Sequence, residues 1–478
     1  MKHFILSIAA ICFFCNVSAT IVLPKILGNN MLLQQKSEAN LWGTAKPNAK
    51  VKVSVSWSSD KIHTNSDDNG RWFVKVPTPE ASFTPQSITI SDGEKLTLNN
   101  ILIGDVWVCS GQSNMEMPVK GFNSQPVENS MNYILTAKEE KNIRMFTVGW
   151  ARSYNEEQDD CESGEWEEAS TESIANLSAV AYFFAHHLTR ALNIPIGVIT
   201  PYWGGTRIES WMPLSALKEC VTPAQYEHKQ TVHPIKPSEL YCAMIAPIRN
   251  FTAKGFLWYQ GESNLGDIDH YDTMMARMVR QWRDDWGDKD NKMPFYYVQI
   301  APYVYGGSRD IAYPLFVESQ VRALKIIPNS GMAATTDIGE EHCIHPAKKI
   351  EVGQRLAGLA LEQSYGLKGF DPKAPLLKSH EIKDGKIILS FDNAEKGLNP
   401  WFQTPITGFE IAGADRVFYP AKAWVSDNSV NKVTVWNDEV KEPVAVRYAF
   451  RNYMPSNLCN TFGIPVVPFR TDNWNDVK

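Results

Sequence analysis

Ser113 lies in the segment Gly111-Gln112-Ser113-Asn114-Met115, which follows the apolar run 101–109. A serine on a glycine-containing turn at the end of a buried strand exposes its hydroxyl at the rim of a sheet, where a general base can reach it. The position therefore suits a nucleophile for acyl transfer. An ordinary polar turn has the same composition, so the reading depends on other segments of the chain.

Two further segments carry chemistry-bearing residues. The sequence WYQGESN at 258–264 follows another apolar stretch, and IHP at 344–346 opens a helical pattern. GQSNM, WYQGESN and IHP, in this order, resemble the sialate O-acetylesterase family of the SGNH-hydrolase superfamily, which removes acetyl groups from carbohydrates. The resemblance covers nearly the whole mature chain, since exported members of the family also flank the hydrolase core with β domains.

His345 is the predicted base. An unactivated serine is a poor nucleophile, so it needs a group that takes its proton during attack. Pro346 suits the first position of a helix, and Val352, Leu356 and Leu359 continue an apolar face behind it,. His345 is therefore expected at a helix N-terminus, where the helix dipole disfavours imidazolium. A histidine that only caps the helix is the structural alternative.

The sequence does not identify the acid that orients His345. SGNH hydrolases often place an aspartate three residues before the histidine, but His342 occupies that position. Resemblance to acetylesterases with a QGE motif implies Glu262 instead. A backbone carbonyl is a further possibility, and so are three nearby acids, Asp337, Glu340 and Glu341.

The family resemblance also implies donors for the oxyanion of the tetrahedral intermediate. They are the Ser113 backbone N–H, the turn 203–206 with Gly204 as its preferred donor, and a side-chain amide from Gln260 or Asn264,. Gly204 in a simple turn and Gln260 as a tie between loops are the structural alternatives.

Arg207 is the expected substrate-binding residue, because its guanidinium can meet the carboxylate of sialic acid. It can instead pair with the Glu209 region. Three tryptophans near the motifs can either line a sugar pocket or belong to the core: Trp203, Trp211 and Trp258,.

A metal site is not expected. His342 and His345 are three residues apart and can share a helix face, but the local sequence offers neither a third ligand nor a glutamate base,. No CxxC motif is present. The predicted chemistry therefore needs no metal and no organic cofactor.

The elements that position these residues follow from hydrophobic patterning. Buried-strand candidates lie at 101–109, 194–200, 255–260, 295–300 and 331–336. Helical spacing appears between them, at 176–192 and 271–286,. This alternation predicts an α/β fold of the SGNH or flavodoxin-like type, a parallel sheet flanked by helices, with its ligand beyond the carboxyl ends of the strands.

The flanking segments have a different texture. Residues 20–100 and 371–478 carry short alternating stretches separated by Gly, Pro, Asn and Asp turns. They predict N- and C-terminal β-sandwich domains around a catalytic domain at 101–370. Residues 1–19 have the charged start, apolar stretch and small-residue cleavage site of a secretory signal peptide, so an exported, periplasmic or extracellular protein is expected.

Composition narrows the function classes. The 478-residue chain has a net charge of −6 and a pI near 6.0, which gives no electrostatic footprint for nucleic acid,. No window after the leader is apolar enough for a membrane helix, so no membrane insertion is expected. Export permits disulfides, for example one from Cys161, but irregular cysteine spacing names no partner,. Oligomeric state has no sequence signal.

The sequence thus predicts an exported serine esterase that removes O-acetyl groups from a sugar or glycan, with O-acetylated sialic acid as the expected substrate. An acetylxylan or other hemicellulose acetylesterase would use the same residues on another sugar. A non-catalytic carbohydrate-binding protein is the alternative of another class. It accounts for the β domains but not for Ser113 and His345 on strand-end loops.

Overall fold

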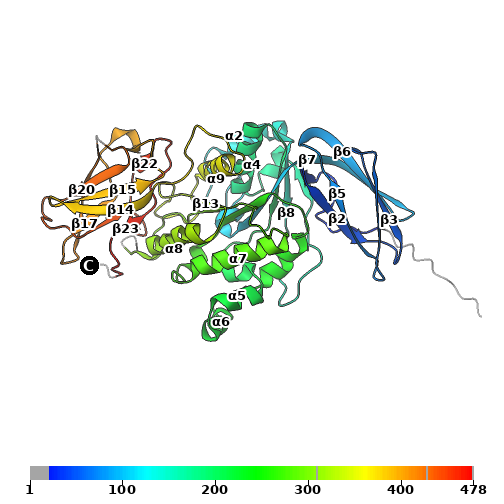
Figure 1. The fold of residues 1–478 in the computed structure, drawn as a ribbon, viewed down its shortest axis with the longest axis horizontal. Helices are drawn as coiled ribbons and strands as arrows, with labels where there is room; N and C mark the ends of the chain where they lie inside the picture. The colour runs from blue at the N-terminus through cyan, green and yellow to red at the C-terminus, as the bar shows by residue number, and fades with distance from the viewer. Residues whose placement is uncertain (1–20, 308–309, 427–428, 476–478) are drawn as a thin grey trace, which may run out of the picture.

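The computed structural model describes residues 21–307, 310–426 and 429–475. Three parts follow one another along the long axis: a β domain at the N-terminal end, an α/β domain in the middle and a second β domain at the C-terminal end (Figure 1). The predicted signal peptide, residues 1–19, lies outside the described residues.

The central sheet has the strand order β13-β12-β11-β7-β10-β8-β9. All neighbours on this path run parallel except β9, which is antiparallel to β8. The bounds are β7 Lys95–Gly111, β8 Ile143–Thr147, β9 Trp166–Glu168, β10 Ile196–Thr200, β11 Gly255–Tyr259, β12 Phe295–Val298 and β13 Ser330–Ala333.

Helices cover both faces of this sheet, with α4 and α9 on one side and α7 and α8 on the other (Figure 1). Side chains of β11 alternate between the two layers: Phe256 and Trp258 pack with the α7 side, and Leu257 packs with the α4 and α9 side,. Because both faces are buried, the strands are apolar throughout. The α-helices are α1 Ser113–Glu116, α2 Ser130–Thr136, α3 Thr171–Ile174, α4 Ala179–Leu192, α5 Leu214–Cys220, α6 Pro223–Lys229, α7 Tyr271–Asp285, α8 Ala312–Ile326 and α9 Lys349–Gln363.

The N-terminal domain shares a strand with the central sheet. The first part of β7 pairs with β6 and β1, and its second part pairs with β10 and β11. The predicted boundary between residues 100 and 101 therefore falls inside one continuous strand. The other strands of this domain are β1 Leu32–Gln34, β2 Glu38–Thr44, β3 Lys50–Val55, β4 Lys61–Asn65, β5 Arg71–Pro77 and β6 Ser82–Ser91.

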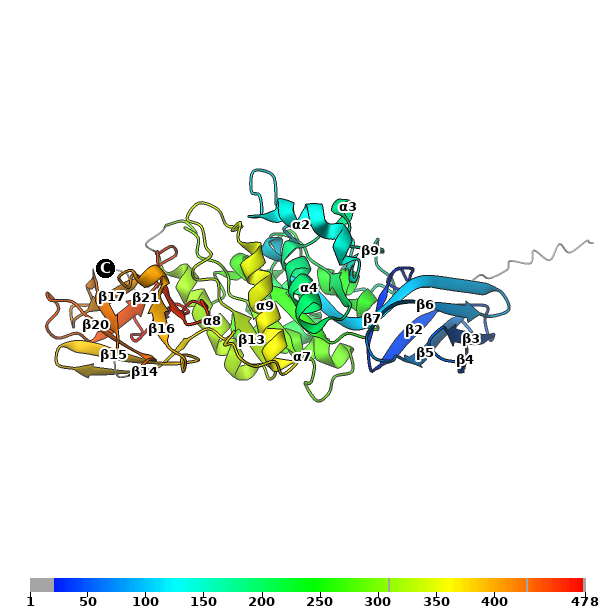
Figure 2. The same ribbon diagram turned by 90° about the horizontal axis from the view of Figure 1, so that it is seen from above.

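The C-terminal domain contains two four-stranded antiparallel sheets and a two-stranded one, around a separate apolar core. Figure 2 shows it at the opposite end of the molecule from the N-terminal domain. Its strands are β14 Leu376–Lys383, β15 Lys386–Asp392, β16 Leu398–Pro400, β17 Phe409–Ala412, β18 Phe418–Pro420, β19 Lys422–Val425, β20 Lys432–Trp436, β21 Ala445–Tyr448, β22 Leu458–Asn460 and β23 Phe469–Arg470.

The predicted α/β class is confirmed: a mostly parallel central sheet flanked by helices, with additional antiparallel sheets. Among the described residues no helix is long and apolar enough to cross a bilayer. The six described cysteines are free, so the disulfide considered for Cys161 is not formed in this structure.

Candidate active site

Ser113 is the first residue of α1, directly after the turn that ends β7. Gly111 makes this turn possible: its φ is +150°, and a Cβ there would lie 2.1 Å from the Tyr259 carbonyl oxygen,. The close approach of β11 lets Gln112 N–H donate to the Tyr259 carbonyl at 3.0 Å. Ser113 is thereby held at the carboxyl edge of the sheet, where ligands of parallel sheets bind.

His345 reaches Ser113 from the loop between β13 and α9. Its Nε2 lies 2.8 Å from Ser113 Oγ, and its Nδ1 lies 2.8 Å from Gln125 Oε1. Because an amide oxygen only accepts, Nδ1 carries the proton and Nε2 accepts from the serine hydroxyl. The order serine, imidazole, orienting acceptor is the arrangement by which serine hydrolases activate their nucleophile.

The environment of His345 favours its neutral form. Burial, and to a smaller extent the nearby Lys349 cation, lowers the pKa of His345 to about 4,. The expected neutrality is therefore present, but with a different cause. Helix α9 begins at Lys349, so His345 lies in the preceding loop and not at the helix N-terminus.

Glu262 does not contact His345 in a hydrogen bond. Its Oε1 accepts from Asn114 Nδ2 at 2.6 Å, and its Oε2 is buried with no donor among the described residues. Burial raises the pKa of Glu262. The structure therefore brings Gln125, not Glu262, to the position of the orienting group. Gln125 lies in a loop whose sequence shows no motif, so the sequence analysis did not identify it as a partner of His345.

Asn114 links the two sides of the site. Besides Glu262, it donates to the Ile344 carbonyl at 3.1 Å and accepts from Lys349 Nζ at 2.7 Å. Lys349 is fully buried, and burial lowers its pKa to about 7. Glu262, Asn114 and Lys349 thus form a buried polar network behind Ser113 and His345, and it holds the nucleophile turn against the histidine loop.

The other acids considered for His345 have different partners. Asp337 forms a two-armed ion pair with Arg355, each arm 2.7 Å long. Glu340 accepts from the Ala347 backbone N–H at 2.8 Å. Glu341 lies 3.9 Å from His342, at the surface. None of these hydrogen bonds or ion pairs includes His345.

The predicted side-chain oxyanion donors are engaged elsewhere. Gln260 Nε2 has three acceptors within 3.0 Å, the Gln112 side chain, the Thr206 carbonyl and the Asn264 side chain. Asn264 Nδ2 donates to Glu209 and Asp267, each at 3.0 Å. Both amides are fully buried. The structure therefore uses them to tie loops together, which was the alternative reading for Gln260.

Gly204 lies beside Ser113, since a Cβ at Gly204 would be 3.3 Å from Ser113 Cβ. Its backbone N–H donates to Glu116 Oε2 at 2.5 Å. The Ser113 N–H has no acceptor among the described residues. Two backbone donors therefore flank the serine hydroxyl. One of them, the Gly204 N–H, is occupied by the Glu116 carboxylate, which the sequence analysis did not identify.

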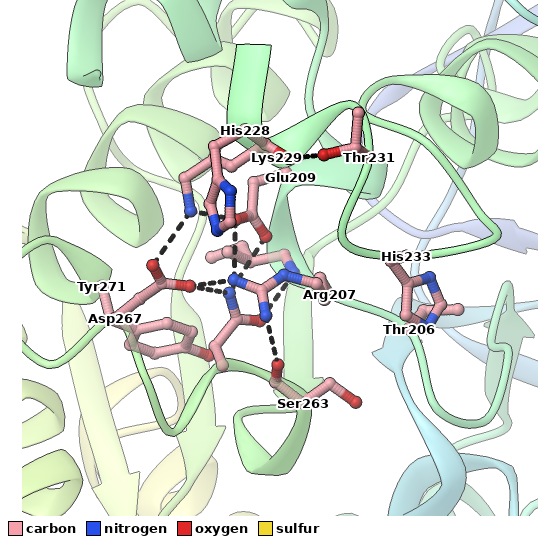
Figure 3. Close-up of polar contacts among 12 residues, drawn as sticks. Thr206, Arg207, Glu209, His228, Lys229, Thr231, His233, Ser263, Asp267 and Tyr271 are labelled. Atoms are coloured by element: carbon pink, nitrogen blue, oxygen red, sulfur yellow. Dashed lines mark hydrogen bonds and ion pairs between the residues drawn. The ribbon is translucent and has the colours of Figure 1, made fainter. Parts of the chain in front are cut away.

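Arg207 lies in a buried network of charges (Figure 3). Its guanidinium pairs with Asp267 and Glu209 and donates to the Ser263 carbonyl at 2.8 Å. Lys229 joins the same two carboxylates. Two cations and two anions thus balance, and the guanidinium expected to bind substrate is held by the protein itself.

The tryptophans divide into two groups. Trp211 and Trp258 are fully buried and pack edge to face, so they belong to the core. Trp203 is only partly buried and stacks on Trp150, with ring centroids 5.3 Å apart and planes 14° apart. No cluster of three metal-ligating side chains occurs in the part of the chain that the structure describes.

A serine hydroxyl hydrogen-bonded to an imidazole at the edge of a parallel sheet is the arrangement that serine hydrolases use, and comparison with known proteins gives the family. Residues 103–362 match the family model described as carbohydrate esterase, sialic acid-specific acetylesterase. The chain belongs to this family and is a carboxylic ester hydrolase acting on carbohydrate acetates, not a non-catalytic binding protein.

Named proteins of similar sequence or structure are also carbohydrate acetylesterases. Sialate O-acetylesterase of Homo sapiens is 29% identical over 398 residues, which cover 76% of this chain and 75% of the human protein. The Mus musculus protein of the same name is 29% identical over 429 residues, covering 77% and 78%. The crystal structure of a carbohydrate acetylesterase from Xanthomonas citri is 34% identical, with a TM-score of 0.85, and the match covers 95% of this chain and all of that one.

Proposed function

We propose that Ser113 and His345 are the catalytic pair of an exported carbohydrate O-acetylesterase. The observation that carries the proposal is the continuous hydrogen-bond chain from Ser113 Oγ through His345 to Gln125 Oε1, with both distances 2.8 Å. Neutral His345 takes the serine proton as Oγ attacks the acetyl carbonyl. The imidazolium then protonates the departing sugar oxygen, and an acetyl-enzyme remains.

Deacylation uses the same groups in reverse roles. His345 takes a proton from water, the hydroxide attacks the acetyl-enzyme, and the proton returns to Ser113 Oγ as acetate leaves. The net reaction is sugar acetate plus water to sugar plus acetate. The free Ser113 N–H supports the oxyanion in both tetrahedral states, and Gly204 N–H joins it once the Glu116 carboxylate releases that bond,.

Substrate choice rests on a second observation. Family resemblance favours O-acetylated sialic acid, whose carboxylate calls for a cation such as Arg207. That guanidinium is committed to Glu209 and Asp267, which favours the second candidate, an acetylated neutral polysaccharide of the hemicellulose type. The proposed export rests on residues 1–19 alone, and N-terminal sequencing of protein secreted by the native host tests it, with Thr20 as the expected first residue.

Acetate release tests the catalytic proposal. We expect the wild type to release acetate from a small aryl acetate and from at least one of two sugar substrates, O-acetylated sialic acid and acetylated xylan. Ser113→Ala and His345→Ala are expected to lose more than about a thousandfold of this activity. Ser379→Ala and His380→Ala are matched controls, because both residues are exposed on β14 of the C-terminal domain. Full activity of folded Ser113→Ala would refute the proposal.

A further inference from the structure

A cavity of about 360 Å³ opens beside the catalytic pair. Glu116, three residues after Ser113, and Phe122, whose ring packs edge-on against the His345 imidazole at 5.1 Å, both line it. Tyr202, two residues after the end of β10, lines it as well. Ser113 does not line the cavity, but these neighbours place it directly against the serine and histidine. A group bound here is adjacent to the ester under attack.

One wall of the cavity is an aromatic platform. Trp150 lines the cavity and is 55% exposed, which is unusual for so large an apolar side chain,. Its other face stacks on Trp203. This stacking fixes the indole plane, and the exposed ring offers an apolar surface with a polar edge, which suits the C–H face of a pyranose ring.

Glu116 gives the cavity its charge. Its Oε2 accepts from Gly204 N–H, while its Oε1 has no donor among the described residues. The free oxygen is an acceptor for a sugar hydroxyl. The free hydroxyl groups of a neutral sugar supply such donors, whereas a carboxylate ligand would meet a like charge in a partly desolvated space.

No lysine, arginine or histidine lines this cavity in the described part of the chain. Lys120, which does not line it, donates to Asn176 Oδ1 at 2.7 Å, and Asn176 is a lining residue. Arg207 is held by Glu209 and Asp267. The cavity therefore offers the Glu116 carboxylate as an acceptor for sugar hydroxyl groups, but its lining offers no cation for the carboxylate of a sialic acid.

We propose that the cavity between Glu116 and Trp150 is the sugar-ring subsite of this esterase and that it selects uncharged acetylated sugars over carboxylated ones. Trp150 stacks on the ring, and Glu116 accepts a hydroxyl of the acetylated sugar. The inference rests on the proposed function, because it names the substrate class of the same serine and histidine.

The test separates charge from shape. O-acetylated sialic acid and its 1-carboxamide have nearly the same shape and differ at C1, where the amide has no charge, and acetylated xylo-oligosaccharide serves as the neutral reference. We expect wild-type kcat/KM to be at least about tenfold higher for the carboxamide than for the carboxylate, since like charges in a partly buried site oppose binding. Glu116→Gln keeps an acceptor, removes the charge and is expected to bring this ratio close to one.

Trp150→Ala tests the platform. It is expected to lower the ratio of kcat/KM on the xylo-oligosaccharide to kcat/KM on a small aryl acetate by about fivefold, chiefly through KM, since stacking contributes on the order of 1 kcal/mol. Trp424→Ala is the matched control, because Trp424 is 59% exposed on β19 of the C-terminal domain. Circular dichroism and Tm confirm that each variant is folded.

The outcomes distinguish the two proposals. Hydrolysis of sugar acetates with the carboxylate preferred, or a carboxamide ratio that Glu116→Gln leaves unchanged, overturns the neutral-sugar subsite and leaves the esterase intact. A wild type that releases acetate from no sugar and from no aryl acetate overturns the esterase proposal and the subsite together.

Discussion

Gln125→Glu tests whether Gln125 sets the protonation of His345. The amide oxygen lies 2.8 Å from His345 Nδ1, and a glutamate oxygen can take the same place. An anion at this distance stabilises imidazolium and typically raises a histidine pKa by about 1–3 units. Because burial lowers the pKa of His345 to about 4, the variant is expected to titrate near pH 6.

The sign follows from the role of His345 as a base. Below its pKa the imidazole is protonated and cannot accept the Ser113 proton, so activity falls on the acid side. At pH 5 about nine-tenths of His345 is neutral in the wild type, with its pKa near 4, but only about one-tenth in a variant whose pKa is two units higher. The predicted loss in kcat/KM of the variant at pH 5, compared with the wild type and with each normalised to its value at pH 8, is therefore about tenfold.

The assay is the pH profile of kcat/KM between pH 4 and 9 with a small aryl acetate. Gln125→Met is the matched control, because it has similar volume and no comparable acceptor. It is expected to lower the plateau value of kcat/KM by roughly 2- to 13-fold, which corresponds to the loss of one hydrogen bond of about 0.5–1.5 kcal/mol. It should not shift the acid limb to higher pH. An acid limb of Gln125→Glu that coincides with that of the wild type refutes the reasoning.

Three further changes have expected outcomes. Glu262→Gln should keep kcat/KM within about tenfold, measured at pH 8, since Glu262 bonds Asn114 and not His345,; a loss of a thousandfold would restore Glu262 as the triad acid. Lys349→Met should shift the acid limb of the kcat/KM profile to higher pH, because the Lys349 cation lowers the pKa of His345. An acid limb at the wild-type pH or at a lower pH contradicts this. Arg207→Ala should lower the free energy of unfolding by about 3 kcal/mol in chemical denaturation, since it leaves the carboxylates of Glu209 and Asp267 with Lys229 and the Asn264 amide as partners,. A raised KM at unchanged stability would instead indicate substrate binding.

The strands were predictable because burial on both faces leaves a strong signal. Apolar runs at 255–260 and 295–300 correspond to β11 and β12 within two residues at each end,. The positions of Ser113 and His345 followed, since the carboxyl ends of parallel strands meet at one edge. The edge strand β9 has three residues, too few to give a periodic pattern.

The start of α9 was not predictable from Pro346. Proline favours the first turn of a helix, but His345 makes hydrogen bonds to Ser113 and Gln125. The buried Lys349 Nζ donates to the Pro346 carbonyl at 2.9 Å. These are contacts between distant segments, and local propensity carries no information about them. Gln125 is 220 residues from His345 in the chain, so local sequence could not predict their hydrogen bond either.

The amides of WYQGESN show why residue type alone does not assign an oxyanion donor. A buried amide must satisfy its hydrogens, and the count of acceptors decides whether one is left for substrate. Gln260 Nε2 has two hydrogens and three protein acceptors, and Asn264 Nδ2 has two hydrogens and two carboxylate acceptors. Neither amide has a donor to spare, so the proposed mechanism places the oxyanion at the backbone N–H of Ser113, joined by the Gly204 N–H once Glu116 releases it.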